Sequence, residues 1–468
     1  METTVSAAPV ALPEDVLADI LGRLMARSIA ACLQGMSLRG FFVNYYDHQR
    51  AHLFARPTPA AAGGPRIDGK FSYIEPEPGA EPQQGVGPFR KVADHCNGLV
   101  IYQSDHYDVQ LYVCNPVTRR WVHLLPLLSV ERMYLRRMFL VFNPAMSRHY
   151  EVLVAPLDPE KKEPLLKRHP HWRPSFYDTA MARRYAPQPP VDNREWPPSR
   201  WTWHVFSSRT GRWRERVFIR EGEAAGLAAD MVRDHAQRYA VYWQGALYVH
   251  CRGRYVSRLS LSDGKYRVIR LPINNGVQSF IGRSLKGVYF ASVQWRQLRV
   301  WILNVCSDET EWILKHASVL WPKDWWPDDM TSDYYEMQCN GPWILDEYDN
   351  GKRKRNVDWS SDDDDNNCTE DWQDHDQNDG HMYVHDSLNF LGFHPYKEIV
   401  FLTHGHEAVA YHLNTRKVQF LGILKPWDYT NCGVYSSFVY TPCYALRDRG
   451  SASVDNFHGM GQASSSCS

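Results

Sequence analysis

The sequence predicts a mainly β fold, on the basis of its composition and of a recurring hairpin pattern. Its 468 residues include 17 Trp, 26 Tyr and 18 Phe, together with 29 Gly and 29 Pro. Aromatic residues favour strands, and Gly and Pro favour the turns between strands. A chain of this length exceeds what one hydrophobic core usually supports, so we expect several domains or a modular, repeated architecture.

One pattern recurs along the chain: an apolar strand, a turn built from Asn, Ser, Asp, Gly or Thr, and a second strand that starts with an aromatic or aliphatic residue. This pattern is typical of a β-hairpin. Its five copies cover residues 112–121, 205–213, 259–266, 300–312 and 410–418. The second strands start at Trp121, Trp213, Tyr266, Trp312 and Val418.

The spacing of these hairpins indicates a repeat. Successive second strands start 92, 53, 46 and 106 residues apart, and the two long intervals fit a skipped unit plus an insertion. Residues 142–150 would supply the hidden unit in the first long interval. A repeat of about fifty residues and about four strands is the spacing of a β-propeller blade, which predicts about six blades. Because the units align by pattern and not by identity, unrelated hairpins in a β-sandwich are the alternative.

A short helix is predicted before the β region. Apolar residues recur at the i, i+3, i+4 and i+7 spacing of one helix face, at Leu17, Ile20, Leu21 and Leu24. Pro13 suits the first turn, where its missing N–H costs nothing. A helix of about a dozen residues is marginal alone, so this face must pack on the body, on a second helix or on another protein.

Residues 12–32 resemble the first half of an F-box, the module by which substrate adaptors bind the Skp-type linker of a cullin-RING ubiquitin ligase. The match rests on the Leu12-Pro13 opening, the acidic pair that follows, the aliphatic stripe and residues 27–32. The resemblance implies linker contacts at Leu12, Pro13, Leu17, Ile20, Leu21 and Leu24. The alternative is an amphipathic helix packed on its own domain.

This copy of the motif departs from the family pattern. Met25 stands where the pattern usually has Pro, and the helix that follows Cys32 in the family is missing. Residues 37–46 read instead as a strand. An F-box shares its core with the linker, so the loss of its last helix removes part of the interface. We therefore interpret residues 12–34 as a partial F-box.

The β region carries a second resemblance. Asp94-His95-Cys96-Asn97-Gly98-Leu99-Val100, followed by residues 114–121, is similar to the opening of the kelch-like, F-box-associated β-propeller of large plant F-box families. The resemblance covers residues 12–32 and, more loosely, 89–447, and it implies that the propeller captures an unidentified protein destined for ubiquitination. The expected divisions are a partial F-box at 12–34, a connecting segment at 35–88, the propeller at 89–447 and a disordered tail at 448–468.

Two insertions interrupt the repeat. Residues 157–200 are rich in Pro and basic residues, and residues 322–386 are rich in charged and polar ones. Such compositions bury too little apolar surface to offset the entropy of ordering, so we expect loops. The acidic run at 362–365 lacks the glycine and closing glutamate of an EF-hand. His404-Gly405-His406-Glu407 comes nearest to a metal site, but its pattern is that of a strand, and we expect no metal and no cofactor.

Charge and motifs limit the function classes. Lys+Arg and Asp+Glu both number 53, so the chain as a whole offers no basic field to nucleic acid or to an anionic membrane. No apolar run has the length of a membrane span, and the start does not read as a signal peptide, so we expect a soluble protein of the cytoplasm or nucleus. Ten cysteines without a Cys-x-x-Cys pair indicate buried free thiols.

Three functions remain open at this point. The first is a non-catalytic substrate-recognition adaptor of an SCF-type ligase. The second is a propeller-only protein-interaction module that the shortened F-box has decoupled from the ligase. The third is a propeller hydrolase. The sequence contains no nucleotide-binding, serine-hydrolase or zinc-protease motif that would support it. This function would require a cluster of titratable residues in one central pocket.

Overall fold

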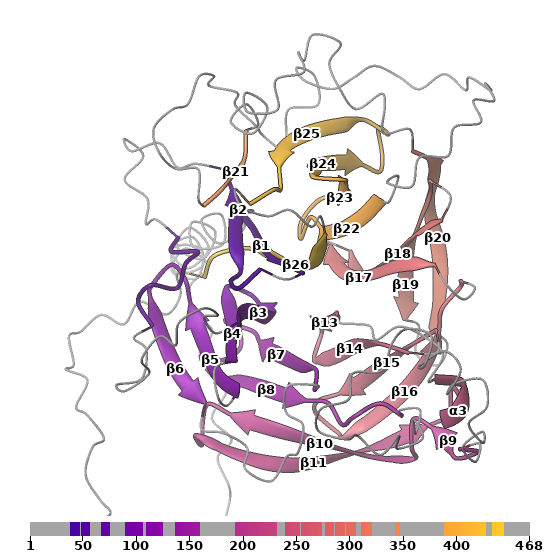
Figure 1. Cartoon of the computed structure of the whole chain (residues 1–468). Helices are drawn as coiled ribbons and strands as arrows, with labels where there is room; N and C mark the ends of the chain where they lie inside the picture. Colours follow the sequence, from indigo (N-terminus) through magenta and orange to yellow (C-terminus); the bar gives the residue numbers. More distant parts are fainter. Residues whose placement is uncertain are drawn as a thin grey trace, which may run out of the picture.

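Strands dominate the computed structural model of the protein, which confirms the mainly β fold expected from the sequence (Figure 1). The structure describes residues 38–46, 48–56, 67–74, 89–105, 109–124, 136–159, 192–231, 239–252, 254–273, 277–284, 286–294, 296–305, 310–320, 342–346, 388–426 and 433–443. The helix expected in residues 12–34 and the tail at 448–468 lie outside these described residues.

The described strands form antiparallel units of four. The first unit contains β3 (Phe89–Cys96), β4 (Leu99–Asp105), β5 (Val109–Asn115) and β6 (Arg120–Leu124). The second contains β7 (Met138–Phe142), β8 (Tyr150–Val154), β10 (Arg200–Ser207) and β11 (Arg212–Glu221). The third contains β13 (Ala240–Trp243), β14 (Ala246–Cys251), β15 (Tyr255–Ser260) and β16 (Lys265–Arg270). β11 pairs in parallel with β16, which joins the second and third units into one eight-stranded sheet.

Three further units complete the body. The fourth contains β17 (Gln278–Ser284), β18 (Gly287–Gln294), β19 (Gln297–Val305) and β20 (Thr310–Val319). The fifth contains β22 (Leu388–Phe393), β23 (Ile399–His404), β24 (Glu407–His412) and β25 (Val418–Ile423). The sixth contains β26 (Val434–Tyr440), β1 (Gly40–Tyr45), β2 (His52–Ala55) and β21 (Ile344–Leu345). Beside the second unit, β9 (Glu195–Trp196) pairs with β12 (Gly226–Leu227), which leads into α3 (Ala228–Met231).

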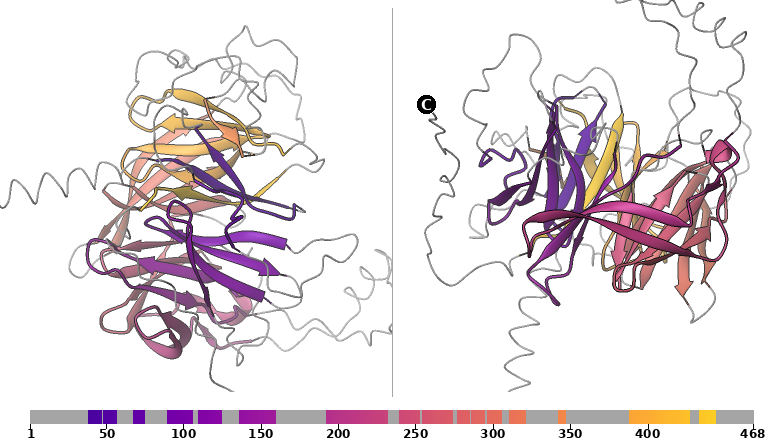
Figure 2. Two further views of the ribbon diagram at one scale, coloured as in Figure 1. Left: turned by 90° about the vertical axis from the view of Figure 1, so that its left-hand side faces the viewer. Right: turned by 90° about the horizontal axis from the view of Figure 1, so that it is seen from below.

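One edge strand of each unit lies at the centre of the molecule. These inner strands contact one another in a closed ring, in the order β26, β3, β7, β13, β17, β22 and again β26. Figure 1 looks onto this ring, with the remaining strands of each unit further out. Figure 2 shows the same units from two further sides. The ring brings the first and the last described strands of the chain, β1 and β26, into one sheet.

The core consists of six hydrophobic clusters, each enclosed between two neighbouring units. Successive side chains of a strand point to opposite faces of its sheet. In β1, Phe41 and Val43 therefore pack toward the β22–β25 unit, whereas Phe42 packs toward the β3–β6 unit. Because both of its faces are covered, the inner strand β7 is continuously apolar and entirely buried.

All five hairpins expected from the sequence are confirmed. They are the hairpins β5–β6, β10–β11, β15–β16, β19–β20 and β24–β25. The strand expected within residues 37–46 is confirmed as β1. The prediction that residues 142–150 supply a separate unit is wrong. These residues connect β7 and β8 in a hairpin, and both strands belong to the same unit as β10 and β11. The first long interval thus arises from chain inserted between β8 and β10 within one unit.

The expectation that residues 322–386 form only a loop is also wrong for the described part, residues 342–346. There β21 pairs with β2, and the side chain of Trp343 is 1% exposed. Its ring lies 5.4 Å from that of Phe41 and 5.7 Å from that of Phe54, measured between centroids. A large apolar side chain with partners on two other strands can offset the entropy of ordering this short stretch.

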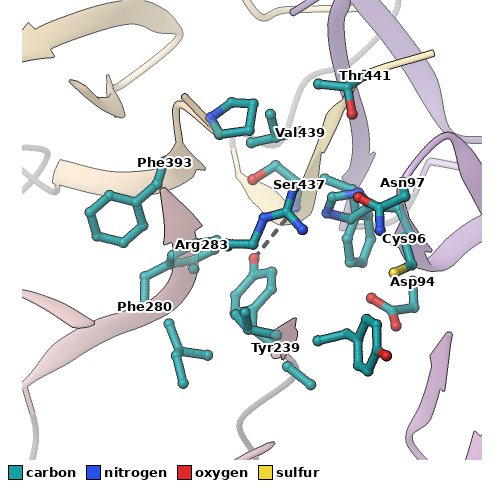
Figure 3. A pocket seen from close by; sticks show the side chains of 18 residues that line it. Asp94, Cys96, Asn97, Tyr239, Phe280, Arg283, Phe393, Ser437, Val439 and Thr441 are labelled. Atoms are coloured by element: carbon teal, nitrogen blue, oxygen red, sulfur yellow. Dashed lines mark hydrogen bonds between the residues drawn. The ribbon is translucent and has the colours of Figure 1, made fainter. Parts of the chain in front are cut away.

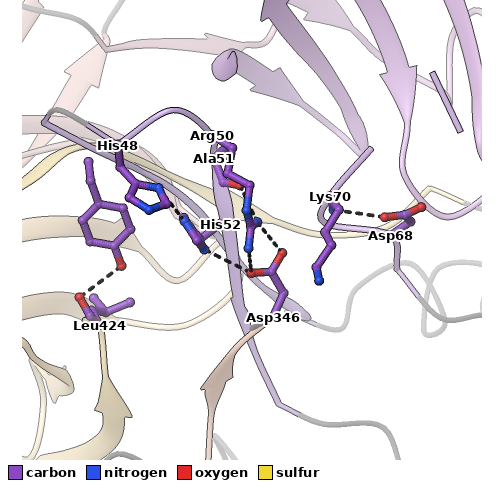
Figure 4. A network of polar contacts seen from close by, with 9 residues as sticks. His48, Arg50, Ala51, His52, Asp68, Lys70, Asp346 and Leu424 are labelled. Atoms are coloured by element: carbon purple, nitrogen blue, oxygen red, sulfur yellow. Dashed lines mark hydrogen bonds and ion pairs between the residues drawn. The ribbon is translucent and has the colours of Figure 1, made fainter. Parts of the chain in front are cut away.

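Polar contacts fix the end of the same segment (Figure 4). The guanidinium of Arg50 donates two hydrogen bonds, of 2.9 and 3.2 Å, to the carboxylate of Asp346. His52 Nδ1 lies 3.2 Å from the same carboxylate, and His52 Nε2 lies 2.9 Å from His48 Nδ1. Burial would raise the pKa of Asp346, but the hydrogen bonds from His52 and Arg50 outweigh it and lower the pKa. The charged carboxylate of Asp346 therefore holds residues 342–346 against Arg50 and His52, at the start of β2.

Candidate functional site

The central pocket lies inside the ring of inner strands. Its lining comes from β3, β13, β17, β22 and β26 and from residues next to them. The space open to water-sized molecules is about 90 Å³, enough for several of them. Figure 3 shows the side chain of Arg283 near Tyr239 and Ser437, with Phe280 and Phe393 on one side and Asp94, Cys96 and Asn97 on the other.

The path of β3 brings polar groups to the pocket. The register of β3 against β4 shifts between Val92 and Asp94, and such bulges redirect the side chains that follow them. The strand then ends in a tight turn with positive φ at both Asn97 (45°) and Gly98 (89°), the pattern of a type I′ hairpin. A Cβ at Gly98 would lie 2.4 Å from the backbone nitrogen of Cys443, so this turn requires glycine.

Two other glycines let the inner strands approach one another beside the pocket. A Cβ at Gly282 in β17 would lie 2.4 Å from the ring of Phe393 in β22. A Cβ at Gly392 in β22 would lie 2.4 Å from Val439 in β26, and Gly392 has a φ of 149°. Larger residues at these positions would force the strands apart, so the narrow ring depends on both glycines.

Asp94 is the buried carboxyl group of the pocket. Its side chain accepts a 2.7 Å hydrogen bond from the backbone N–H of Leu140 in β7. Burial raises the pKa of Asp94 to about 8, because backbone hydrogen bonds from Leu140 and His95 only partly offset the cost of burying the charged form. Asp94 is therefore mainly protonated at neutral pH.

Arg283 is the only Lys or Arg among the described residues that line the pocket. Its Cζ lies 5.7 Å from the centroid of the Trp243 ring, within cation–π distance. In the described part of the chain, its guanidinium makes no hydrogen bond and no ion pair with a carboxylate. The side chain is partly exposed, so the guanidinium, which is unpaired within the described ranges, can offer N–H donors to a ligand in the pocket.

The titratable neighbours of Arg283 are held in their uncharged forms. Burial, aided by the charge of Arg283, lowers the pKa of His95 to about 4. Burial raises the pKa of Cys96 to about 12, and its thiol lies 3.3 Å from the carbonyl oxygen of Phe142. A protonated thiol is a poor nucleophile. The pocket thus contains titratable residues, as the hydrolase hypothesis requires, although the protonated thiol of Cys96 is not an activated nucleophile.

The stretch that came nearest to a metal site is a hairpin. His404 ends β23, Gly405 and His406 form the turn, and Glu407 begins β24. His404 Nδ1 lies 3.5 Å from a carboxylate oxygen of Glu407. Within the described ranges, no group of three or more His, Cys, Asp or Glu side chains has the geometry to hold a metal ion.

The structure does not place the residues that the sequence assigned to partner binding. Those residues, all outside the described ranges, are Leu12, Pro13, Leu17, Ile20, Leu21 and Leu24. Conversely, sequence reasoning gave no role to Arg283 or Tyr239. Asp94 to Asn97 belonged to a stretch quoted for its family resemblance, and the Asn97-Gly98 turn was the one local signal near the pocket. Four cysteines that the structure describes are buried thiols, as expected: Cys96, Cys114, Cys251 and Cys443.

Comparison with known proteins finds no family model that matches the chain and no significant match among curated proteins. In the described part of the chain, no helix has the length and apolar character needed to cross a membrane.

Proposed function

We propose that this protein is a non-catalytic substrate-recognition adaptor of an SCF-type cullin-RING ubiquitin ligase, acting in the cytoplasm or nucleus. Residues 12–34 dock to the Skp-type linker, and the β body is a kelch-like propeller of six blades that binds the target protein. The adaptor needs no cofactor, because the conjugating enzyme carries out ubiquitin transfer. Its own contribution is the proximity and effective concentration of the target.

The observation that carries this proposal is the closed ring of inner strands. Six units of four strands, with β26 and β1 sharing the sixth, are what a six-bladed propeller requires, since its first and last blades must meet. Such a closed ring gives every unit two neighbours, and it offers a central cavity as well as loops for binding. This arrangement supports the kelch-like domain that the resemblance at residues 94–121 implies.

The docking step is tested by replacing Ile20 and Leu21 with Asp. Purified Skp-type linker should bind the wild-type chain saturably and should not bind the I20D/L21D variant. The substitutions would bury two unpaired carboxylates in an apolar interface, which costs on the order of several kcal/mol for each carboxylate. The matched control is I313D/L314D in β20, where the side chains are 40% and 52% exposed. Undiminished linker binding by I20D/L21D would refute the docking assignment.

The second function, a propeller-only interaction module decoupled from the ligase, is motivated by the helix missing after Cys32. The same pull-down separates the two. Saturable linker binding by the wild-type chain supports the adaptor, whereas no binding at high micromolar linker concentration supports the decoupled module. In both cases the body remains the part that binds the target.

A further inference from the structure

We propose that the central pocket is a binding site for a carboxylate carried on an apolar or aromatic group, with Arg283 as its charge partner. The inference concerns the ligand chemistry of the body alone and does not depend on coupling to a ligase. A guanidinium presents a planar fork of N–H donors that matches a carboxylate with two parallel hydrogen bonds. Arg283 supplies this fork at the centre of the ring, with no carboxylate of the described chain paired to it.

The charge of the pocket fits a monoanion. Arg283 contributes one positive charge, while Asp94, His95 and Cys96 are mainly uncharged at neutral pH. A single carboxylate would balance Arg283. A phosphate dianion would bring a second charge into a half-buried site that holds no second cation among the described lining residues, and such uncompensated burial is costly.

The aromatic side chains that line the pocket favour an apolar or aromatic group next to the carboxylate. The ring of Tyr239 lies 4.3 Å from that of Phe280, and the ring of Phe280 lies 6.1 Å from that of Phe393, measured between centroids. All three rings line the pocket. In Figure 3, Phe280 and Phe393 lie on the side away from Asp94, and Tyr239 lies between them and Asp94. An apolar or aromatic group would pack against these rings while its carboxylate reaches Arg283.

Benzoate is a suitable probe, with benzamide as its uncharged match. Calorimetric titration of the full chain should show saturable binding of benzoate and at least tenfold weaker binding of benzamide. The R283Q substitution should lower the affinity for benzoate at least tenfold. R283K should lower it less than R283Q does, because the positive charge remains. R209Q, a control at an exposed turn, should leave the affinity unchanged. Inorganic phosphate should bind more weakly than benzoate.

Peptides distinguish the two sources of a carboxylate. The tripeptide acetyl-Ala-Ala-Phe is compared with the same peptide amidated at its C-terminus. Binding of the free-acid peptide assigns the pocket to a polypeptide carboxylate, and binding of benzoate without the peptide assigns it to a free small acid. Both outcomes support a carboxylate site. If neither ligand binds, or if the uncharged analogues bind equally well, the proposal is overturned.

A crystal structure of the wild-type chain with benzoate gives a readout that does not depend on a variant folding. The expected position places both carboxylate oxygens within hydrogen-bond distance of the Arg283 guanidinium and the phenyl ring against Phe280. Benzoate found only elsewhere, or unchanged benzoate affinity in R283Q with an unchanged melting temperature, would overturn the assignment. Linker binding is measured separately, so failure here leaves the proposed function standing.

Discussion

Asp94 and Arg283 line the same pocket, yet each is held by a different neighbour. Asp94 accepts a hydrogen bond from the backbone of Leu140, and Arg283 lies over the ring of Trp243. Burial raises the pKa of Asp94 to about 8, so at neutral pH its carboxyl group does not neutralise the guanidinium.

The pKa of Asp94 predicts how stability depends on pH. Between the usual value of 3.8 and about 8, the folded chain holds a proton that the unfolded chain has lost. The free energy of unfolding therefore falls as pH rises through this window, by at most about 1.4 kcal/mol per pH unit from this group. D94N keeps an oxygen for Leu140 but cannot ionise, so the variant should gain stability relative to wild type as pH rises.

Urea unfolding of both proteins at pH 5, 6.5 and 8 checks this prediction. The difference in unfolding free energy, variant minus wild type, should increase from each pH to the next. His95 opposes Asp94 below pH 6.5, because its pKa of about 4 makes stability fall as pH falls, but this contribution is common to both proteins and cancels in the difference. A difference that stays constant with pH would contradict the assigned protonation of Asp94.

β21 shows that a very short element can be fixed by its neighbours. It has two residues and pairs with β2 over both of them. The backbone N–H of Trp343, just before it, donates a 2.9 Å hydrogen bond to the carbonyl of Leu421 in β25. The segment thereby bridges the fifth and sixth units. Its local sequence, set in a polar insertion, gives little sign of this role.

Replacing Trp343 with Ala should destabilise the protein by about 3–5 kcal/mol, since it removes a fully buried indole and leaves a cavity. Thermal and urea unfolding measure the loss. M146A is the control, because Met146 is 82% exposed and its truncation should change stability by less than about 0.5 kcal/mol. Equal effects of the two substitutions would show that the 342–346 segment does not pack as described.

At the scale of the whole molecule, stability depends on closing the ring. β26 pairs with β1 and also contacts β3 and β22. Its side chains contribute to two of the six clusters: Val439 to the one shared with the β22–β25 unit, and Phe438 and Tyr440 to the one shared with the β3–β6 unit. Removing this strand would open both interfaces at once.

A chain that ends at residue 433 should therefore lose its cooperative thermal transition and its near-ultraviolet circular dichroism. The comparison is a chain that ends at residue 447, which keeps β26 and should retain the transition of the full-length protein. Cooperative unfolding of the 433-residue chain would mean that the remaining units fold without closure, as in an open repeat array.

Local chemistry explains which parts of the fold could be predicted. The hairpin at residues 259–266 carries its own turn residues and alternating side chains, and it forms as expected. Residues 142–150 form a hairpin, but the prediction placed it in the wrong unit. The local sequence does not specify with which other strands a hairpin will pair. The pocket escaped prediction for the same reason, since Asp94 and Arg283 come from units far apart in the chain.

The sequence by itself determined the five hairpins, the strand within residues 37–46 and the mainly β class, because alternation and turn preference act over a few residues. Only the tertiary structure decided that β1 and β26 share a sheet, that residues 342–346 pack into the core, and that Arg283 faces a pocket with a protonated carboxyl group nearby. Those features depend on contacts between distant residues, and burial, which sets the pKa of Asp94, exists only once the inner strands have closed into a ring.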